Sequence, residues 1–252
     1  MKLKDKVVVI TGASSGIGKA LAFEFAQRGA SLVLGARNQQ ARSEIALQVQ
    51  TQYHMKAIAI RWDVTVEDDC VQLIKQAVSS FGRIDVLINN AGISMRALFK
   101  DTSTDVLKRL MDVNFWGMVY CTHASMPYLL QSGGSVVGVS SIAGYKGLPG
   151  RTGYSASKFA MNGFLDALRV ENLKTGVHIM TACPGFTASN IRNTALAKDG
   201  SAQGESSMEE EKMMTAGEVA RRIVGPEHGT DAPQHQRDAV PGLRPVEPGG
   251  AV

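Results

Sequence analysis

Short apolar runs alternate along the chain with longer stretches in which apolar residues recur every three or four positions. The runs are typical of strands in a parallel sheet covered on both faces, and the periodic stretches of helices with one buried face. Strands are predicted at Val7–Thr11, Leu32–Gly35, Ala57–Arg61, Val86–Asn89, Ser135–Ser140 and His178–Ala182. Helices are predicted at Ile17–Arg28, Gln40–Tyr53, Glu67–Phe81, Thr104–Leu130 and Gly153–Thr175. This alternation predicts an α/β fold with one doubly wound parallel sheet, which binds ligands beyond the carboxyl ends of its strands.

Two segments depart from the alternation. Thr194–Lys212 is a long polar insertion after the sixth predicted strand, where a flexible lid would lie. From Gly225 onward there are five prolines, five glycines and no aromatic residue, and apolar periodicity ends. With 252 residues, 44% of them hydrophobic, the chain suits a single core. We therefore predict one domain over residues 1–224 and a largely disordered tail over residues 225–252.

Composition and charge narrow the class of protein. The formal net charge of +4 is spread without a basic run, so nucleic-acid binding is not indicated. No segment reaches the roughly 18 apolar residues of a membrane span. Cys70, Cys121 and Cys183 are odd in number and widely spaced, which is typical of reduced intracellular thiols, and the histidines do not cluster as metal ligands. We expect a cytoplasmic protein without a metal and without nucleic-acid or membrane partners.

A glycine-rich segment connects the first predicted strand to the first helix. It reads Thr11-Gly12-Ala13-Ser14-Ser15-Gly16-Ile17-Gly18. Glycines allow a tight turn and a close approach of the backbone to a pyrophosphate, and the helix N-terminus offers free N–H groups and a favourable dipole. The segment therefore predicts a dinucleotide site, with a tight turn that binds nothing as the alternative.

The end of the second predicted strand carries information on the nucleotide. Sheets that bind NAD usually place an acidic residue there to hold the ribose 2′-hydroxyl. This chain has Arg37 instead, whose planar cation suits a 2′-phosphate. The position favours NADP(H) over NAD(H), although a solvated surface arginine would give the same sequence.

Tyr154 and Lys158 lie four residues apart and therefore one turn apart on the same face of a predicted helix. A phenol is a weak acid, with an ordinary pKa of about 10. A nearby positive charge stabilises the phenolate and lowers that pKa. The pair thus fits a proton donor for carbonyl reduction, although the same spacing arises by chance on many helices.

These segments, together with Asn89-Asn90-Ala91-Gly92 and Pro184-Gly185, resemble the short-chain dehydrogenase/reductase family, and within it the hydroxysteroid-dehydrogenase-like branch. The resemblance runs from about Lys6 to about Val224. It implies an NAD(P)-binding Rossmann domain, an oxidoreductase acting on CH–OH groups, and a homodimer or homotetramer.

The resemblance also implies the roles of particular residues. Tyr154 would donate the proton, Lys158 would stabilise the phenolate and hold the ribose hydroxyls, Ser141 would bind the substrate oxygen, and Asn114 would hold a water that relays protons. The implied cofactor-binding residues are Gly12, Ser14, Ser15, Gly16, Ile17, Gly18, Arg37, Asp63, Val64, Asn90, Ala91, Gly92, Tyr154, Lys158, Pro184, Gly185, Thr187 and Ser189. Ser189 stands where the family usually has a threonine, so the hydroxyl is kept.

The C-terminal part departs from the family pattern. In the family, a last helix leads into a seventh strand and a segment that helps to close the substrate pocket. Here the predicted helix Gly217–Val224 is followed by the Pro/Gly-rich tail, without a strand candidate. We predict that the seventh strand is missing, that the pocket is more open, and that the C-terminus is altered, for example by a frame shift or a fusion scar.

Three functional hypotheses follow. The favoured one is an NADP(H)-dependent oxidoreductase that interconverts a carbonyl and a secondary alcohol on a small apolar substrate. The residues expected to line the substrate side are Ile93, Met95, Leu148, Phe186, Met213 and Met214. The alternatives are a reductase of 3-oxoacyl thioesters, which would need a basic docking patch, and a cofactor-binding sensor or scaffold without turnover.

Overall fold

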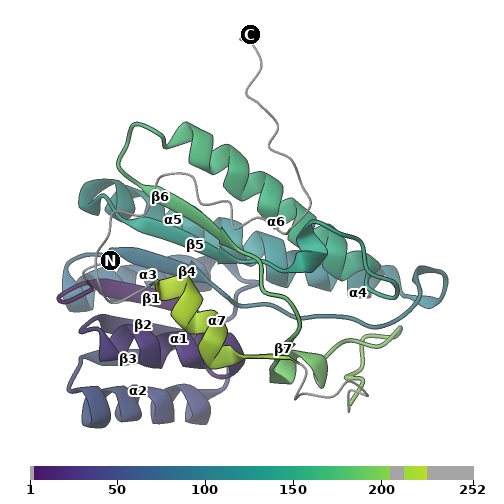
Figure 1. Ribbon diagram of the computed structural model, residues 1–252, viewed down its shortest axis with the longest axis horizontal. Coiled ribbons are helices and arrows are strands. Elements are labelled where there is room, and N and C mark those ends of the chain that lie inside the picture. Colours follow the sequence, from purple (N-terminus) through teal and green to yellow (C-terminus); the bar gives the residue numbers. More distant parts are fainter. Residues whose placement is uncertain (1–2, 205–212, 226–252) are drawn as a thin grey trace.

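The computed structural model describes residues 3–204 and 213–225. Its centre is a parallel sheet of six strands in the order β3-β2-β1-β4-β5-β6 (Figure 1). The strands are β1 (Val7–Thr11), β2 (Ser31–Ala36), β3 (Ala57–Arg61), β4 (Val86–Asn89), β5 (Ser135–Val139) and β6 (His178–Ala182). The predicted fold class is confirmed, and the described residues contain no seventh strand of this sheet. The order reverses between β1 and β4, which is where such sheets bind ligands.

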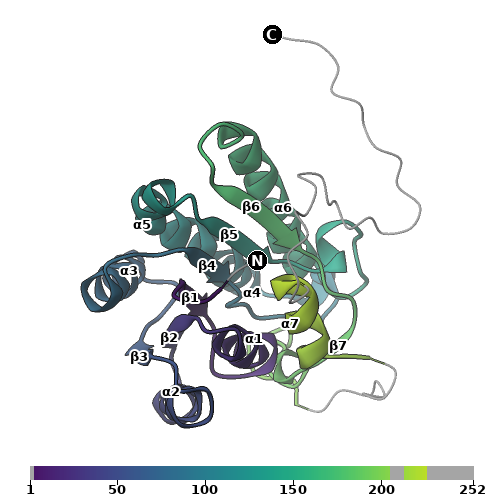
Figure 2. The same cartoon turned by 60° about the vertical axis from the view of Figure 1, so that its left-hand side comes forward.

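Helices cover both faces of the sheet. One face packs against α1 (Gly16–Gln27), α2 (Gln39–Tyr53) and α7 (Ala216–Val224), and Figure 2 shows α7 beside α1. The other face packs against α3 (Glu67–Phe81), α5 (Gly117–Ser132) and α6 (Thr152–Glu171). Arg28 after α1 donates to the Gly225 carbonyl at 2.6 Å, which ties the end of α7 to the end of α1.

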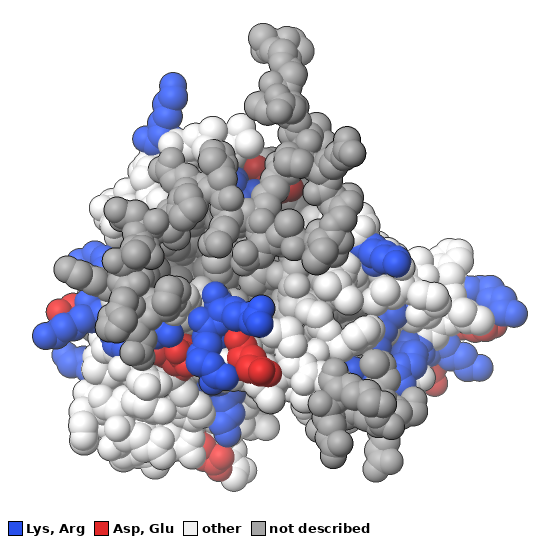
Figure 3. All heavy atoms as spheres, viewed as in Figure 1, with Lys and Arg blue, Asp and Glu red and all other residues white. Residues whose placement is uncertain are grey.

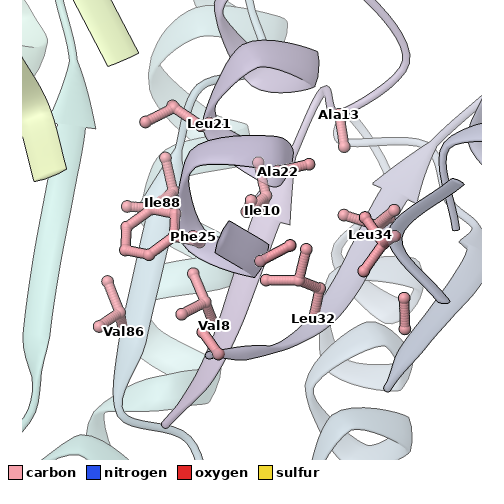
Figure 4. Close-up of a cluster of buried hydrophobic side chains, with 14 of the residues drawn as sticks. Val8, Ile10, Ala13, Leu21, Ala22, Phe25, Leu32, Leu34, Val86 and Ile88 are labelled. Atoms are coloured by element: carbon pink, nitrogen blue, oxygen red, sulfur yellow. The ribbon is translucent and has the colours of Figure 1, made fainter. Parts of the chain in front are cut away.

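The core follows from the alternation of side chains along each strand. In β1, Val8 and Ile10 face α1, whereas Val7 and Val9 face the layer of α3 and α5. Figure 4 shows Val8 and Ile10 packed around Phe25 of α1. Because both faces of the strand are buried, all five β1 residues are apolar or, for Thr11, hydrogen-bonded internally. This explains the uninterrupted apolar run in the sequence.

The predicted single helix Thr104–Leu130 is wrong in one respect. It consists of α4 (Thr104–Met111), a π-helical turn η2 (Asp112–Trp116) and α5. A π turn accommodates one extra residue and redirects the side chains around it. Here the turn contains Asn114, whose side chain bonds the backbone of Ile93 instead of facing solvent. The tertiary contact therefore decides the local geometry.

The predicted polar lid is also partly wrong. Its first residues are not a polar flap, because Ala195 is fully buried and Leu196 is 4% exposed. Leu196 forms a bridge with Met95 and its N–H donates to the Ser94 carbonyl at 2.8 Å. The later part of the lid, residues 205–212, and the predicted tail from residue 226 lie outside the described residues. Two short parallel strands, β7 (Thr187–Ala188) and β8 (Met214–Thr215), precede α7.

Charged side chains of both signs lie on the face shown in Figure 3, with Lys and Arg next to Asp and Glu at several places. Among residues 3–204 and 213–225, no helix has the length and apolar character needed to cross a membrane.

Candidate active site

A cleft of about 560 Å³ lies at the carboxyl ends of the strands. It collects residues from the turn after β1, the end of β2, the segment after β4, the turn after β5, α6 and the segment after β6. Of the catalytic and cofactor-binding residues expected from the sequence, those that line the cleft are Gly12, Ser14, Ser15, Gly16, Ile17, Arg37, Asp63, Val64, Asn90, Ala91, Gly92, Ser141, Tyr154, Lys158, Pro184, Gly185, Thr187 and Ser189. Gly18 and Asn114 do not line it and lie behind its wall.

The glycine loop has the geometry of a phosphate-binding turn. Gly12 and Gly16 have φ angles of 66° and 53°, which side chains of L-residues rarely allow. A Cβ on Gly18 would lie 2.3 Å from the Gly12 carbonyl oxygen and 2.5 Å from Asn90 Nδ2. Asn90 in turn donates to the carbonyl oxygens of Thr11 at 2.9 Å and Gly12 at 3.1 Å. The loop is thus held tightly against the segment after β4.

The N-terminus of α1 opens onto the cleft beside this loop. Its N-cap residue, Ser15, is extended and its side chain makes no capping hydrogen bond. The helix dipole and the first N–H groups therefore favour an anion at this end. Together with the close backbone approach of the glycines, these residues fit the pyrophosphate of a dinucleotide.

The end of β2 carries an exposed cation. Arg37 lines the cleft near Asp63, and its backbone carbonyl accepts a hydrogen bond from Arg42. The buried Arg42 donates from Nη1 to the carbonyl oxygens of Ala36 at 3.2 Å and Arg37 at 3.1 Å. Burial would raise the pKa of Asp63, but hydrogen bonds from Thr65 and the charge of Arg37 outweigh it and lower that pKa. A cation and an ionised carboxylate therefore stand at this end of the cleft.

Tyr154, Ser141 and Lys158 meet at the opposite end of the cleft. Ser141 follows β5 and lines the cleft together with Tyr154. The Lys158 ammonium lies 5.8 Å from the centre of the Tyr154 ring. Burial raises the pKa of Tyr154, and the opposing effects of Ser141 and Arg151 are smaller. The lowered phenol pKa expected from the sequence is therefore wrong for the protein alone, because burial outweighs the stabilisation of the phenolate.

Lys158 is almost completely buried, at 3% exposure. Burial lowers the pKa of its ammonium group to about 8, and only the nearby Cys183 acts in the opposite direction. Nζ donates to the Val139 carbonyl at 2.9 Å and contacts Met161 Sδ at 3.3 Å. The ammonium is thus anchored at the end of β5, 5.8 Å from the centre of the Tyr154 ring.

Asn114 supports the site without lining it. Its Oδ1 accepts from the Ile93 N–H at 2.8 Å, and its Nδ2 donates to the Ile93 carbonyl at 3.0 Å and to Ser157 Oγ at 2.9 Å. Ser157 Oγ donates to the Tyr154 carbonyl at 2.8 Å. The side chain therefore joins the segment after β4 to the helix that carries Tyr154 and Lys158.

Some residues at the site were missed in the sequence, and three were misplaced: Met95, Met213 and Met214, expected on the substrate side, do not line the cleft. Arg151, Ser94 and Cys183 were not expected at the site, although Arg151 stands only three positions before Tyr154. Arg151 Nη1 donates to Ser94 Oγ, and Cys183 influences the pKa of both Tyr154 and Lys158. Met95, expected on the substrate side, is fully buried in a small core with Leu196 and does not line the cleft. Cys183 could have been suspected because it precedes Pro184.

The arrangement suits the transfer of a proton beside a bound anionic ligand. It combines an anion-binding helix N-terminus at one end of a cleft with a buried hydroxyl pair and a buried amine at the other. In the part of the chain that the structure describes, no group of three or more histidine, cysteine or acidic residues could hold a metal ion.

Comparison with known proteins identifies the class. Residues 6–200 match the family model of the short chain dehydrogenases, and the chain belongs to this family. A curated relative, 11-beta-hydroxysteroid dehydrogenase 1A of Arabidopsis thaliana, is 41% identical over 191 residues, which cover 75% of this chain and 54% of the relative. Relatives of this kind support the hydroxysteroid-dehydrogenase-like branch. The chain spans about half the length of several curated relatives that it matches.

Solved structures agree on the fold. An alcohol dehydrogenase from the archaeon Thermococcus sibiricus, in complex with 5-hydroxy-NADP, matches with a TM-score of 0.78 and 26% identity, over 86% of this chain and 88% of that one. A short chain dehydrogenase/reductase from Burkholderia phymatum, in complex with NAD, matches with a TM-score of 0.79 over 87% and 84%. Its identity is 24%, so that likeness concerns the fold alone.

Proposed function

We propose that this protein is an NADP(H)-dependent oxidoreductase that interconverts a carbonyl and a secondary alcohol. The observation that carries the proposal is the presence of Tyr154 and Ser141 in the same cleft as the glycine loop Gly12–Gly18. Neither the glycine loop nor the pair of Tyr154 and Ser141 would be specific for such an enzyme alone. A phosphate-binding turn and a buried proton donor that face one cleft are what a nicotinamide-dependent reaction at a carbonyl requires.

Each side chain then has a chemical task. A bound nicotinamide cofactor would supply or accept the hydride. Tyr154 gives its hydroxyl proton to the substrate oxygen in reduction and takes it back in oxidation. Ser141 binds the same oxygen and keeps it within reach of the phenol. Lys158, held by the Val139 carbonyl, has its ammonium 5.8 Å from the centre of the phenol ring and would hold the ribose hydroxyls of a bound cofactor. Asn114 fixes the helix that carries both residues through Ser157.

NADP(H) is the proposed cofactor because of Arg37. This exposed guanidinium stands at the end of β2, where a sheet that binds NAD usually has a carboxylate for the ribose hydroxyls. A guanidinium can bind a 2′-phosphate through two hydrogen bonds. Arg42 holds the carbonyl of Arg37 and keeps this turn in place. The Thermococcus neighbour contains an NADP analogue, whereas the Burkholderia neighbour contains NAD, so the argument depends on Arg37.

The proposed substrate is small and largely apolar. Ile93, Leu148 and Phe186 line the cleft near Tyr154 and offer apolar surface, and Phe186 is 48% exposed. Burial of such surface against a substrate contributes roughly 25 cal/mol for each Å².

A homo-oligomer formed through α5 and α6 completes the proposal. Trp116 at the end of η2, immediately before α5, and Phe159 and Val170 on α6 are exposed by 43%, 48% and 67%. Large apolar side chains gathered on neighbouring helices are typical of an interface. Light scattering after gel filtration, compared with a Phe159→Glu variant, tests this: a monomeric wild-type protein at micromolar concentration contradicts it.

One plate of assays tests the activity. Oxidation of NADPH and of NADH is followed with ketones, aldehydes, quinones and 3-oxoacyl thioesters. We expect turnover of a ketone or aldehyde with NADPH, and a loss of at least about 100-fold in kcat for Tyr154→Phe, which lacks the acidic proton. Equal rates for Tyr154→Phe remove Tyr154 as the acid. Turnover confined to 3-oxoacyl thioesters favours the thioester reductase, and cofactor binding without any turnover favours a sensor.

A further inference from the structure

Arg151 lies on the wall of the active-site cleft, immediately before α6. Its side chain is half-buried, and its Nη1 donates to Ser94 Oγ in the segment after β4. That segment is held in turn by Leu196, whose N–H donates to the Ser94 carbonyl at 2.8 Å. The guanidinium is therefore held at one place on the cleft wall, although an arginine side chain has many rotamers.

Only part of this guanidinium is used within the protein. Ser94 takes Nη1, whereas Nε and Nη2 make no hydrogen bond to any residue of 3–204 or 213–225. These two donors lie side by side on one edge of the planar group and match the two oxygens of a carboxylate. Arg83 shows the match in the same chain, because its Nε donates to Asp85 Oδ2 at 2.9 Å and its Nη2 to Oδ1 at 2.6 Å. Arg151 keeps the same pair of donors unpaired on the wall of a cleft.

The charges along the cleft indicate the same kind of ligand. Among the described residues that line it, Asp63 is the single acidic one, and it lies at the other end, near Arg37. Arg109 of α4 is exposed and lines the cleft as a further cation. Arg192 also lines it, but Arg192 is only 6% exposed and its Nη1 contacts Met213 Sδ at 3.1 Å, so it is less accessible to a ligand. The substrate end of the cleft therefore favours an anion.

The unpaired donors are costly in this place. Burial lowers the pKa of the Arg151 guanidinium, because the charged form is less stable here than in water. A bound anion would offset this cost. The Arg151 N–H donates to the Leu148 carbonyl at 3.1 Å, and Leu148 and Leu196 both line the cleft. A ligand with an apolar body and one anionic group would satisfy the cation and the apolar wall together.

We propose that Arg151 binds a carboxylate of the substrate through Nε and Nη2, and that the protein acts on oxo acids with an apolar carbon chain and on the corresponding hydroxy acids. Ser94 positions the guanidinium, and Arg109 adds positive charge to the same cleft. The carboxylate fixes one end of the substrate and leaves its carbonyl group to Tyr154 and Ser141. The inference rests on the proposed function and adds one charged group to the small apolar substrate.

Matched pairs of substrates separate the effect of the charge from that of the apolar body. Methyl ketones that end in a carboxylate, in a series of chain lengths, are compared with their methyl esters and with analogues that end in a phosphate. With NADPH, the oxo acid of the best length should have a kcat/KM about 10–100-fold above that of its ester, as expected for charge-assisted hydrogen bonds. The gain should lie mainly in KM, because Arg151 binds the substrate and takes no part in proton transfer.

Variants assign this preference to Arg151. Arg151→Met removes the charge and the donors, so the ratio of kcat/KM for acid and ester should fall to about one. Arg151→Lys keeps a charge without the paired donors, and Ser94→Ala releases the guanidinium, so each should retain part of the preference. Lys174→Met, which removes an exposed cation beyond the end of α6, should leave the ratio unchanged. Circular dichroism verifies the fold, and if Arg151→Met does not fold, the other two variants decide.

Binding without turnover gives an independent readout. Isothermal titration calorimetry of the same oxo acids, with the protein saturated with NADP⁺, should show binding that is at least about tenfold weaker in Arg151→Met than in the wild type. If no carbonyl compound is reduced but this loss of binding is found, the proposed function fails and the role of Arg151 stands.

Other outcomes overturn the inference while the proposed function stands. One is a wild-type protein that reduces the esters as well as the oxo acids at every chain length. Another is a preference for oxo acids that survives in Arg151→Met. A preference for the phosphate analogues over the oxo acids would show that the ligand is not a carboxylate.

Discussion

Asn114 pairs with the backbone of Ile93 through both ends of its side-chain amide, at 2.8 Å and 3.0 Å. The pairing occurs because a π-helical turn at Asp112–Trp116 directs the side chain inward, where it is only 1% exposed. The N–H and carbonyl of Ile93, in the segment after β4, are therefore both hydrogen-bonded by a side chain 21 positions further along the chain.

Loss of this amide is expected to weaken both the fold and the reaction. In Asn114→Ala, the Ile93 N–H and carbonyl lose their partner within the protein, and unfolding in urea should become easier by about 1–3 kcal/mol. The rate constant kcat should also fall, because Ser157 no longer ties the helix of Tyr154 to the β4 segment.

Ser157→Ala is the graded comparison for Asn114. It removes the bond at 2.9 Å but leaves the pairing with Ile93 intact, so its effect on stability should be the smaller of the two. Equal losses in both variants would mean that the Ile93 pairing contributes little.

The alternation of apolar runs with helical periodicity was sufficient to predict the sheet, because the four central strands are buried on both faces and the helices on one. The glycine loop, Ser141 and Tyr154 were predicted to face a common site, since the carboxyl ends of parallel strands meet at one edge, and the structure brings them to one cleft. Their chemical roles stay predictions.

Local patterns failed where a distant contact decides the outcome. The π turn around Asn114 depends on the backbone of Ile93, and the position of Arg151 depends on Ser94. Met95 is apolar, as expected of a residue on the substrate side. It is nevertheless buried, because the segment that contains Leu196 forms a bridge with it. Such pairs are far apart in the chain, and a periodicity of two or 3.6 residues contains no information about them.

A substitution at Gly18 tests whether the glycine loop binds the cofactor. In Gly18→Ala, the added Cβ would lie 2.3 Å from the Gly12 carbonyl oxygen, so the loop or the helix must move. We expect at least about tenfold weaker binding of NADPH, measured by fluorescence titration, because small displacements of a site are costly. Gly163→Ala is the control: it lies in the same kind of element, in α6, with nothing within 4 Å of an added Cβ. If both variants bind NADPH equally well, close backbone approach at Gly18 is not required.

A substitution at Arg37 tests the preference for NADP(H) over NAD(H). Arg37→Ala removes the cation at the end of β2, and KM for NADPH should rise by about 10–100-fold, as expected for the loss of charge-assisted hydrogen bonds. KM for NADH should change little, because NADH has no 2′-phosphate. Lys75→Ala, which removes an exposed cation from α3 outside the cleft, serves as the comparison. A wild-type protein that prefers NADH would overturn the NADP(H) proposal directly.

The pH dependence of stability should depend in part on Asp85. Its carboxylate is 2% exposed and binds Lys6 at 2.8 Å, Arg83 at 2.6 Å and the Val7 N–H at 3.0 Å, which ties β1 to β4. Burial would raise its pKa, but the bonds from Arg83, Lys6 and Val7 outweigh burial and lower it. A carboxyl whose pKa is lower in the folded state stabilises the fold above its unfolded pKa of about 3.9, and this contribution is lost as the pH falls through the folded value.

Asp85→Asn should therefore lower the free energy of unfolding at about pH 7 by about 1–3 kcal/mol, a range that allows for the partial exposure of Lys6 and Arg83. The difference from the wild type should shrink in acid, below about pH 3.9, and approach zero once the pH lies below the folded pKa of Asp85, where the wild-type carboxylate is protonated as well. Urea unfolding at both pH values measures it. Asp105→Asn, in an exposed pair with Lys108, should be neutral at both. A difference for Asp85→Asn that is as large in acid as at neutral pH would show that its charge is not what stabilises the start of the sheet.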